Sequence, residues 1–421
     1  MFKAKSNLRV KDRIGGWKGF GTVLAVALAA LLLLAACAPT PTGPPLEKVV
    51  EIGDIAPLTG PPSYSEQICL RAELDYIRYF NEEIGIPGVT IEMTWIDTAT
   101  NAANSVSAYR RFTERGVPVL WSSMCMVKDM FKQNCERDEV PMMFPPNLES
   151  LAYPPGWLYI VGPTAAESFA VVCNHIMENW KEDSPPKGAF MFIDDPYGYE
   201  PIEQGTKYAE SIGIEMLPEE IVPFVPLDTT TQLLRLKERG ADFIYIQCIP
   251  VASGPILRDA ERLGLVGKIQ FCGVEYSLGE RVLEIAGPAA EGYLAAKQCP
   301  WFDETEIPGI KLMIDKQMKY HGKVIREPEY TIWGMMAVTC EAIRRAVEEL
   351  GYENLDGRAI KEALDGMTGF DVYGLYKCTY APEVRRGCDK LAIYQVRGGK
   401  IVGVCIRREA PILVPDVFLK Q

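Results

Sequence analysis

Short apolar segments alternate with longer amphipathic ones from Val49 onward, and this alternation constrains the fold more than any other feature of the sequence. The short segments are rich in Val, Ile and aromatic residues, as buried strands are, and the longer ones repeat apolar residues roughly every three to four positions, as helices do. We predict strands at residues 49–58, 88–97, 117–123, 188–195, 241–248, 268–274 and 292–298. We predict helices at residues 63–83, 102–116, 200–213, 230–240 and 254–264. This strand–helix order predicts an α/β fold with two doubly wound, mostly parallel sheets.

The length of the chain indicates two domains of ordinary size. The sequence has 421 residues, whereas a single hydrophobic core stops growing at roughly 250–300 residues. In doubly wound sheets, ligands bind beyond the carboxyl ends of the strands, where the strand order reverses. We therefore expect the functional residues in the loops that follow the strands.

The start of the first predicted helix carries a capping signal. Ser63 and Glu66 have the spacing of a capping box. In this arrangement both side chains bond backbone amides at the helix start. We therefore expect Glu66 to cap the helix.

The first 36 residues have the organisation of a signal peptide. A basic segment precedes an apolar segment of 14 residues, at positions 23–36, whereas a helix that crosses a bilayer needs roughly 20. The basic residues are Lys3, Lys5, Arg9, Lys11, Arg13 and Lys18. The short apolar segment disfavours an uncleaved anchor, and the cysteine after it disfavours an ordinary signal peptide. Residues 34–37, Leu-Ala-Ala-Cys, match the lipobox of bacterial lipoproteins, so we expect cleavage before Cys37 and a lipid on its thiol.

The exported part of the chain is strongly acidic. Residues 37–47 are rich in proline and predict a flexible tether after the lipidated cysteine. The formal charge of the whole sequence is −12, and loss of the basic signal peptide makes it about −17, which disfavours binding to nucleic acid and to anionic lipid. No second apolar segment reaches the length of a membrane span. Only the lipid on Cys37 is therefore expected to attach this part to a membrane.

The cysteine count suggests disulfides. Twelve cysteines are present, and the eleven that remain after lipidation of Cys37 cannot all pair. Cys125 and Cys135 lie ten residues apart, as do Cys378 and Cys388, and in an exported protein we expect each pair to form a disulfide. The isolated cysteines fit equally well as small buried apolar residues. With only two histidines and no C-x-x-C, we expect no metal site.

Catalytic signatures are scarce. The sequence has no GxSxG, no Walker A lysine motif and no GxGxxG after a predicted strand. Carboxylates are abundant, but their spacing gives no reason to pair two of them as acid and base. An exported two-domain α/β chain of this kind predicts binding in an interdomain cleft, without catalysis and without a cofactor.

Five segments occur in chain order: IGDIAPLTGPPSY, WIDTATNAANSVSAYRRF, IDDPYGY, FCGVEY and IAGPAAEGYLAA. Together they resemble the type I periplasmic substrate-binding proteins of ABC importers, specifically the group that binds leucine, isoleucine and valine. The resemblance covers residues 51–346 and implies a two-lobed fold of Venus-flytrap type, with helices on both faces of each sheet. The chain would cross between the lobes three times. The first lobe would comprise residues 48–164 and 299–374, and the second residues 165–298 and 375–421.

The resemblance implies roles for three residues. Glu275, in GVEY, falls where the family's amino-acid binders carry an acidic residue for the ligand ammonium, and a solvated loop glutamate is the alternative. Tyr197, in DDPYG, resembles the tyrosine that the second lobe places over the ligand, although a purely structural turn has the same sequence. Tyr64 lies near the family's position for an aromatic residue of the pocket and at a predicted helix N-terminus, whose free N–H groups attract anions.

The sequence departs from the family on the carboxylate-binding side of the pocket. The family reads approximately G-x-x-x-S, but here Trp121 stands at the glycine and Cys125 at the serine, with Ser123 two residues early. Asn147 stands near the next position of the family's carboxylate clamp. We expect the turn from Ser123 to Cys125 to donate to an anion. Trp121 is expected either to reshape the cleft or to pack into the core.

These features predict a lipid-anchored solute receptor, exported to the periplasm or held at the outer face of the cytoplasmic membrane. It would bind a small organic solute and deliver it to the permease and ATPase subunits of an ABC importer. If Glu275 dominates recognition, the solute is an amino acid of branched-chain or aromatic type. If the altered carboxylate clamp dominates, it is an amide, a urea-like solute or an aromatic acid. A sensor that signals to a membrane partner stays open as an alternative, and an exported enzyme is disfavoured by the scarcity of catalytic motifs.

Overall fold

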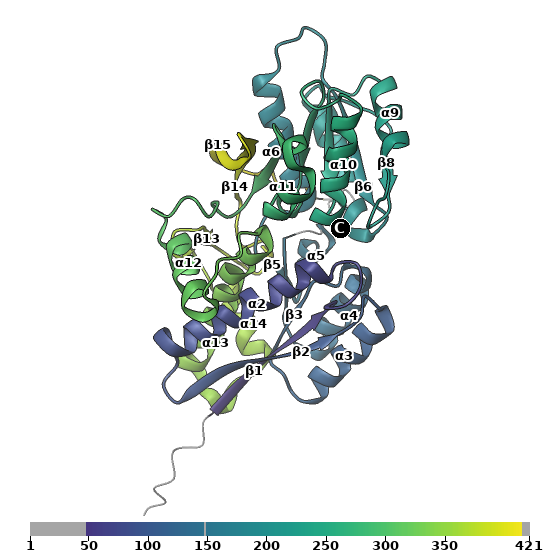
Figure 1. The fold of residues 1–421 in the computed structure, drawn as a ribbon. Helices are drawn as coiled ribbons and strands as arrows, with labels where there is room; N and C mark the ends of the chain where they lie inside the picture. The colour runs from purple at the N-terminus through teal and green to yellow at the C-terminus, as the bar shows by residue number, and fades with distance from the viewer. Residues whose placement is uncertain (1–47, 147–148, 415–421) are drawn as a thin grey trace, which may run out of the picture. The chain divides into compact units, whose positions relative to one another are not determined.

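Two large sheets organise the described part of the chain. The computed structural model describes residues 48–146 and 149–414, which are coloured in Figure 1. The first sheet has the strand order β2-β1-β3-β4-β5, and its strands are all parallel. These strands are β1 (Lys48–Ala56), β2 (Val89–Asp97), β3 (Val119–Ser122), β4 (Met142–Phe144) and β5 (Leu158–Ile160). We call the part built on this sheet the first lobe.

Helices cover both faces of the first sheet. Helices α3 and α4 pack on one face, and α2 and α13 pack on the other (Figure 1). Helix α12 contacts α2, and α14 contacts α13. The helices are α2 (Ser63–Tyr79), α3 (Ala102–Glu114), α4 (Lys128–Asp138), α5 (Glu149–Ala152), α12 (Pro308–His321), α13 (Ile332–Leu350) and α14 (Gly357–Asp365). Shorter helical segments are η1 (Phe80–Ile84), η2 (Cys125–Val127), η5 (Pro328–Thr331) and η6 (Tyr352–Asn354).

The second sheet has the order β15-β14-β11-β10-β9-β6-β7, and β8 pairs with β6. Its strands are parallel except β14 and β15, which form an antiparallel pair at one edge. The strands are β6 (Lys187–Ile193), β7 (Glu215–Met216), β8 (Glu220–Val222), β9 (Phe243–Gln247), β10 (Gln270–Gly273), β11 (Leu294–Lys297), β14 (Lys390–Arg397) and β15 (Lys400–Glu409). The helical segments are α6 (Ala165–Asn179), α7 (Pro196–Tyr199), α8 (Ile202–Ser211), α9 (Thr230–Glu238), α10 (Pro250–Arg262), η3 (Glu275–Ser277), α11 (Glu280–Ala286) and η4 (Gly287–Ala290). We call this part the second lobe. A small antiparallel sheet joins β12 (Phe370–Asp371) to β13 (Lys377–Cys378).

The predicted α/β architecture is confirmed. Every predicted strand and helix is present, with ends that shift by a few residues. The predictions omitted the antiparallel edge formed by β14 and β15. The chain leaves the first sheet after β5, leaves the second sheet after β11 and returns to the second sheet at β14. The predicted limits of the two lobes stay predictions.

The capping box expected at Ser63 is wrong. The residue before α2 is Pro62, and no side chain caps this helix start. A capping box occurs instead at α6, where the Thr164 side chain accepts from the amide of Glu167 and the Glu167 side chain accepts from the amide of Thr164. Glu66 is therefore left for another role.

The alternation of strand side chains places Trp121 in the core. Successive side chains of a strand point to opposite faces of the sheet. On β3, Leu120 packs with α3 and α4, whereas Val119 and Trp121 pack on the opposite face. The Trp121 Nε1 donates to Thr339 Oγ1 of α13 at 3.0 Å, and the ring is 1% exposed. Trp121 therefore does not reshape the cleft, and of the two expected outcomes the structure supports packing into the core.

The two expected disulfides have different outcomes. Cys125 and Cys135 are separated by η2 and α4, and ten helical residues span roughly 15 Å, too far for a disulfide. That pair is wrong. Cys378 and Cys388 are both buried and unbridged in the structure. Burial raises the pKa of the Cys378 thiol, and the neighbouring Cys388 raises it further. The pairing of these two cysteines stays a prediction.

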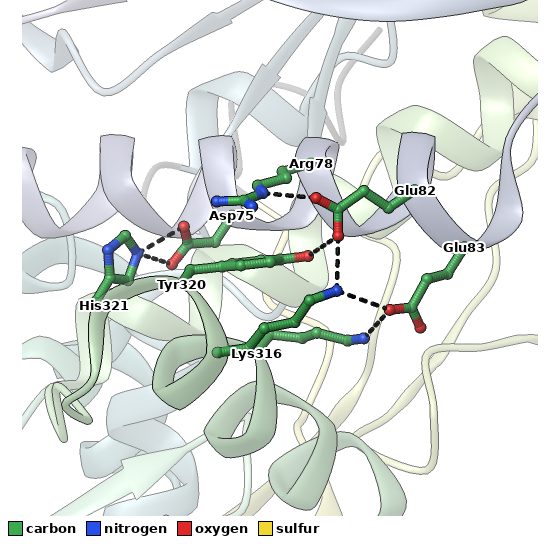
Figure 2. A network of polar contacts seen from close by, with 8 residues as sticks. Asp75, Arg78, Glu82, Glu83, Lys316, Tyr320 and His321 are labelled. Carbon is green, nitrogen blue, oxygen red and sulfur yellow. Dashed lines mark hydrogen bonds and ion pairs between the residues drawn. The ribbon is translucent and has the colours of Figure 1, made fainter.

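A polar network joins α12 to α2 and to η1, which continues α2 (Figure 2). The pairs are His321 with Asp75, Lys316 with Glu83, Lys319 with Glu82, Tyr320 with Glu82, and Arg78 with Glu82. Tyr330 of η5 also donates to Asp75, at 2.5 Å. Asp75, Lys316 and Tyr330 are buried, whereas the other partners are largely exposed and contribute little individually. Together the contacts of Lys316, Lys319, Tyr320 and His321 hold α12 on α2 and η1.

Three chain segments pass between the lobes and are bonded to one another. The amide of Ile160 donates to Arg385 O at 2.8 Å, and the Ile160 carbonyl accepts from the amide of Gly387 at 2.9 Å. The Gln298 side chain donates to Val161 O at 2.8 Å. The residues after β5, after β11 and before β14 therefore meet at one place.

A buried ion pair lies beside these crossing segments, and its disruption is expected to destabilise the protein strongly. Arg386 Nη1 lies 2.7 Å from Glu167 Oε2, and both side chains are buried. Arg386→Met leaves the Glu167 carboxylate buried without its partner, so we expect the free energy of unfolding in urea to fall by about 3–5 kcal/mol. Lys311→Met breaks an exposed pair with Asp315 and is expected to cost less than about 1 kcal/mol. Equal losses for the two variants would contradict this account.

Candidate ligand-binding site

A cavity of about 110 Å³ lies between residues of the two lobes. A single water needs roughly 10–15 Å³ of such space, so the cavity is large enough for a small organic molecule. The first lobe contributes Pro57, Pro62, Ser65, Glu66, Cys69, Thr100, Ser123, Met124, Cys125, Met126, Pro145, Glu329 and Ile332. The second lobe contributes Asp195, Tyr197, Phe224, Ile249 and Tyr276.

The cavity lies at the carboxyl ends of the parallel strands. Pro57, Ser123 and Pro145 follow β1, β3 and β4, and Asp195 and Tyr276 follow β6 and β10. The strand ends of both sheets therefore meet at the same cavity, as expected for doubly wound folds.

Tyr197 lines the cavity on the short helix α7. The Asp195 side chain caps this helix by accepting from the Tyr197 amide at 2.9 Å, and Gln247 donates to the Tyr197 carbonyl at 3.1 Å. The Tyr197 side chain is 8% exposed, and its hydroxyl has no hydrogen-bond partner among the described residues. The helix and its cap thus hold Tyr197 at the cavity, with its hydroxyl buried and without a hydrogen-bond partner among the described residues.

Glu275 does not line the cavity. One carboxylate oxygen accepts from the amide of Gln298 at 3.1 Å. The Lys297 ammonium donates to the carbonyls of Glu275 and Leu278, at 3.1 and 3.2 Å. Burial raises the pKa of Glu275, and the charge of Lys297 opposes this rise. The chain turns into η3 directly after β10, so the next residue, Tyr276, faces the cavity in its place.

The turn from Ser123 to Cys125 lines the cavity, and the donors expected to hold an anion form hydrogen bonds within the protein. The amide of Met124 donates to Ser122 Oγ at 3.1 Å, and the amide of Cys125 donates to Ser123 O at 2.9 Å. The Ser123 hydroxyl donates to Glu66 Oε2 at 2.6 Å. These donors are bonded to Ser122, within the turn, or to the Glu66 carboxylate of α2, so anion binding by this turn stays a prediction.

Tyr64 lies outside the cavity, at a contact between the lobes. Its hydroxyl donates to Glu327 Oε1 at 3.1 Å, and the same oxygen accepts from the amide of Arg281 on α11 at 2.7 Å. The guanidinium of Arg281 lies 5.5 Å from the Tyr64 ring. Burial and the nearby Glu329 raise the pKa of Glu327 to about 8. Asn147, the remaining candidate, lies outside the described residues.

Two acidic residues that the sequence analysis did not select face the cavity. Glu66 is surrounded by protein but keeps partial contact with the cavity, and burial raises its pKa to about 7, against the effect of the Ser123 hydrogen bond. Glu329 is 1% exposed, and one carboxylate oxygen accepts from Ser65 Oγ at 2.5 Å. Its other oxygen has no hydrogen-bond partner among the described residues. Burial also raises the pKa of Glu329.

A second pair of carboxyl groups lies behind Glu66. Asp54 of β1 and Glu73 of α2 are both buried, and a gap of about 10 Å³ touches both of them together with Glu66. Burial raises the pKa of Asp54 and of Glu73, and each is raised further by a neighbouring carboxylate. Glu66 and Glu73 are seven residues apart on one face of α2. The sequence carries one signal of this site that could have been used: two acidic residues on the buried face of an amphipathic helix.

The sequence profile of the family described as "Periplasmic binding protein" matches residues 49–400. The chain belongs to this family. The Leu/Ile/Val-binding protein of Escherichia coli (strain K12) is 25% identical over 286 residues, which cover 64% of this chain and 72% of that protein.

Solved structures of periplasmic binding proteins agree with this assignment. A branched-chain amino acid ABC transporter protein from Thermus thermophilus with bound valine is 25% identical, with a TM-score of 0.80, and the match covers 89% of this chain and 98% of that one. A fatty acid ABC transporter substrate-binding protein from Thermomonospora curvata matches with a TM-score of 0.76 at 20% identity, covering 89% and 97% of the two chains, which shows the fold alone. Within residues 48–146 and 149–414, no helix is both long and apolar enough to cross a bilayer.

The raised pKa of Glu66 predicts a pH-dependent stability. The folded protein holds this proton more tightly than the unfolded chain, because the pKa rises from 4.5 to about 7. Its contribution is therefore complete below pH 4.5 and disappears as the pH rises through about 7. We expect the ligand-free protein to lose about 1–2 kcal/mol more stability between pH 5 and pH 8 than Glu66→Gln, measured by urea titration at each pH.

Other acids keep part of this pH dependence in the variant. Asp54, Glu73 and Glu329 also have raised pKa values, so the slope should shrink and not vanish. Glu353→Gln, which changes an exposed carboxylate, is the control and should match the original protein. A pH profile of Glu66→Gln that matches the original protein would show that Glu66 does not titrate in this range.

Proposed function

We propose that this periplasmic binding protein is the solute-binding component of an ABC importer and captures a small organic solute in the cavity between its lobes. One observation carries the proposal: a cavity of about 110 Å³ is lined from both lobes, at the carboxyl ends of the strands of both sheets. A solute in this place contacts both lobes only when they are together. It therefore favours the closed arrangement through its differential affinity, which a transporter can recognise.

The relatives and the cavity favour different solutes. The E. coli relative is named for leucine, isoleucine and valine, which makes an amino acid the first candidate. Glu275, however, lies outside the cavity lining, where one of its oxygens accepts from the amide of Gln298, and the amides of Met124 and Cys125 are already bonded. The group expected to hold an ammonium thus lies away from the cavity, and two of the amides expected to hold a carboxylate are occupied. We infer that the solute is not bound in the manner expected for an α-amino acid.

The N-terminal segment supports attachment to a membrane. Cys37 follows a lipobox sequence, and residues 37–47 are long enough to separate a lipid from the folded part that begins at β1. A protein held at the membrane surface by this lipid stays close to the permease and ATPase subunits to which it would deliver the solute. These residues lie outside the described part of the chain, so sequence alone supports this step.

Blocking the cavity is expected to abolish solute binding without unfolding the protein. Met126 lines the cavity and is 40% exposed, so Met126→Trp should fill space without disturbing the core. We expect a thermal-shift screen of amines, amino acids, amides and aromatic acids to find a solute that stabilises the protein by about 2.7 kcal/mol at 100 times its Kd. Met126→Trp should remove most of that stabilisation, as expected if the Kd rises at least 100-fold, by about 2.7 kcal/mol.

Met318→Trp is the matched control, because Met318 of α12 is 49% exposed and does not line the cavity. It should bind the solute as the original protein does. Equal binding by all three proteins would show that the solute does not enter this cavity.

Lipidation is tested separately at Cys37. We expect Cys37→Ser to move the protein from the membrane fraction to the soluble fraction of the producing cell, because the lipid acceptor is lost. Mass spectrometry should show a lipid-sized mass on the original protein only. Pro44→Ala, in the same tether, should leave the protein with the membrane, and release of both variants would point to a role of the tether itself.

A further inference from the structure

The charged side chains that line the cavity are all acidic. Glu66 and Glu329 come from the first lobe and Asp195 from the second, and no lysine, arginine or histidine of the described residues lines the cavity. The buried ammonium of Lys297 lies behind it, where it donates to two backbone carbonyls and lies 5.1 Å from the Trp301 ring. A negatively charged ligand would therefore meet carboxylates without a cation to balance them.

Several buried oxygens of residues that line the cavity have no hydrogen-bond partner among the described residues. One oxygen of Glu329 is unpartnered among the described residues, although the residue is 99% buried. The hydroxyls of Tyr197 and Tyr276 also have no hydrogen-bond partner among the described residues, and each residue is 92% buried. A buried polar group without a partner costs about 1–3 kcal/mol, so a ligand that supplies N–H donors relieves this cost. Aromatic rings next to these carboxylates also attract a cation.

Much of the remaining lining is apolar, although Ser65, Thr100 and Ser123 also contribute hydroxyl groups. Pro57, Met124, Phe224, Ile249 and Ile332 surround the acidic groups with hydrocarbon and aromatic surface. A small ion without an apolar part would leave this surface without contacts. The cavity therefore matches a molecule with one cationic end and one apolar body.

We infer that the solute is an organic cation without a carboxylate, a protonated amine whose nitrogen bonds Glu66 and Glu329 and whose apolar body lies against Phe224, Ile249 and Ile332. The inference rests on the proposed function, because it assigns the ligand class of the same cavity. It agrees with the position of the Glu66 carboxylate beside the Ser123 turn, where the amides of Met124 and Cys125 are already bonded.

Binding should strengthen with pH. A cation binds best when Glu66 and Glu329 are ionised, and the pKa of Glu66 is about 7. The charged groups around these two acids are Asp54 on β1, Glu73 on α2, Asp195 before α7, Glu275 on η3, Glu327 before η5 and Lys297 on β11. All but Lys297 are acidic, so their charges also favour a cation as the pH rises.

The test compares ligands that share one apolar body. Isoamylamine is a cation, leucine adds a carboxylate to it, isocaproic acid carries only a carboxylate and isocaproamide carries no charge. Phenethylamine and phenylalanine form a second such pair. We expect calorimetry at pH 8 to give each amine at least tenfold tighter binding than its carboxylate-bearing partner. The affinity for the amines should fall severalfold from pH 8 to pH 6, and the affinity for the amide should not.

Two variants assign the effect to the cavity. Glu329→Gln should weaken amine binding at least tenfold, with the melting temperature of the empty protein as the check on folding. Glu149→Gln removes a buried carboxylate that does not line the cavity and should bind amines as the original protein does. Met126→Trp should abolish amine binding, because it fills the cavity.

The outcomes separate this inference from the proposed function. If leucine or isocaproic acid binds more tightly than the amines, and Met126→Trp abolishes that binding, the cavity is a solute site but the inference of a cation is overturned. Silence from both amines also overturns the inference. If the protein purified without refolding carries no small molecule in native mass spectrometry and the whole solute screen is silent, the proposed function fails as well.

Discussion

The end of β5 holds the two lobes in one structure. The amide and the carbonyl of Ile160 both form hydrogen bonds with the backbone of the segment before β14. The Tyr380 hydroxyl donates to the same carbonyl at 3.0 Å. The next residue, Val161, accepts from Gln298, which follows β11. All three crossings therefore converge within two residues. This junction connects the two sheets whose strand ends line the cavity.

The fold was predictable from the sequence because burial leaves a periodic pattern. Strands such as β3 and β9 are buried along their whole length and stand out as continuous apolar segments. The antiparallel edge at β14 and β15 was missed, because a half-exposed hairpin lacks the alternation with helices that marked the rest. Strand periodicity also explains Trp121, since a shift of one residue along β3 moves a side chain from one face of the sheet to the other.

The site was less predictable, because its residues lie where the periodic pattern ends. Tyr197, Ser123 and Cys125 were selected and do line the cavity, whereas Glu275 misses it by one position in the turn after β10. Glu66 was interpreted as a helix cap from its spacing to Ser63. Only the packing of α2 against the Ser123 turn shows that its carboxylate faces the cavity. A turn that differs by one residue leaves no trace in composition or hydropathy, yet it places Tyr276 and not Glu275 at the cavity.

The contact between Glu327 and the amide of Arg281 joins the lobes without touching the cavity lining. Most differences in affinity among related complexes arise from dissociation rates. A bond of this kind breaks whenever the lobes separate, so it slows the escape of any solute regardless of the solute's chemistry. In such an arrangement, residence time and selectivity would depend on different residues. Mutation can lengthen or shorten the residence time of the solute while the choice of solute stays unchanged.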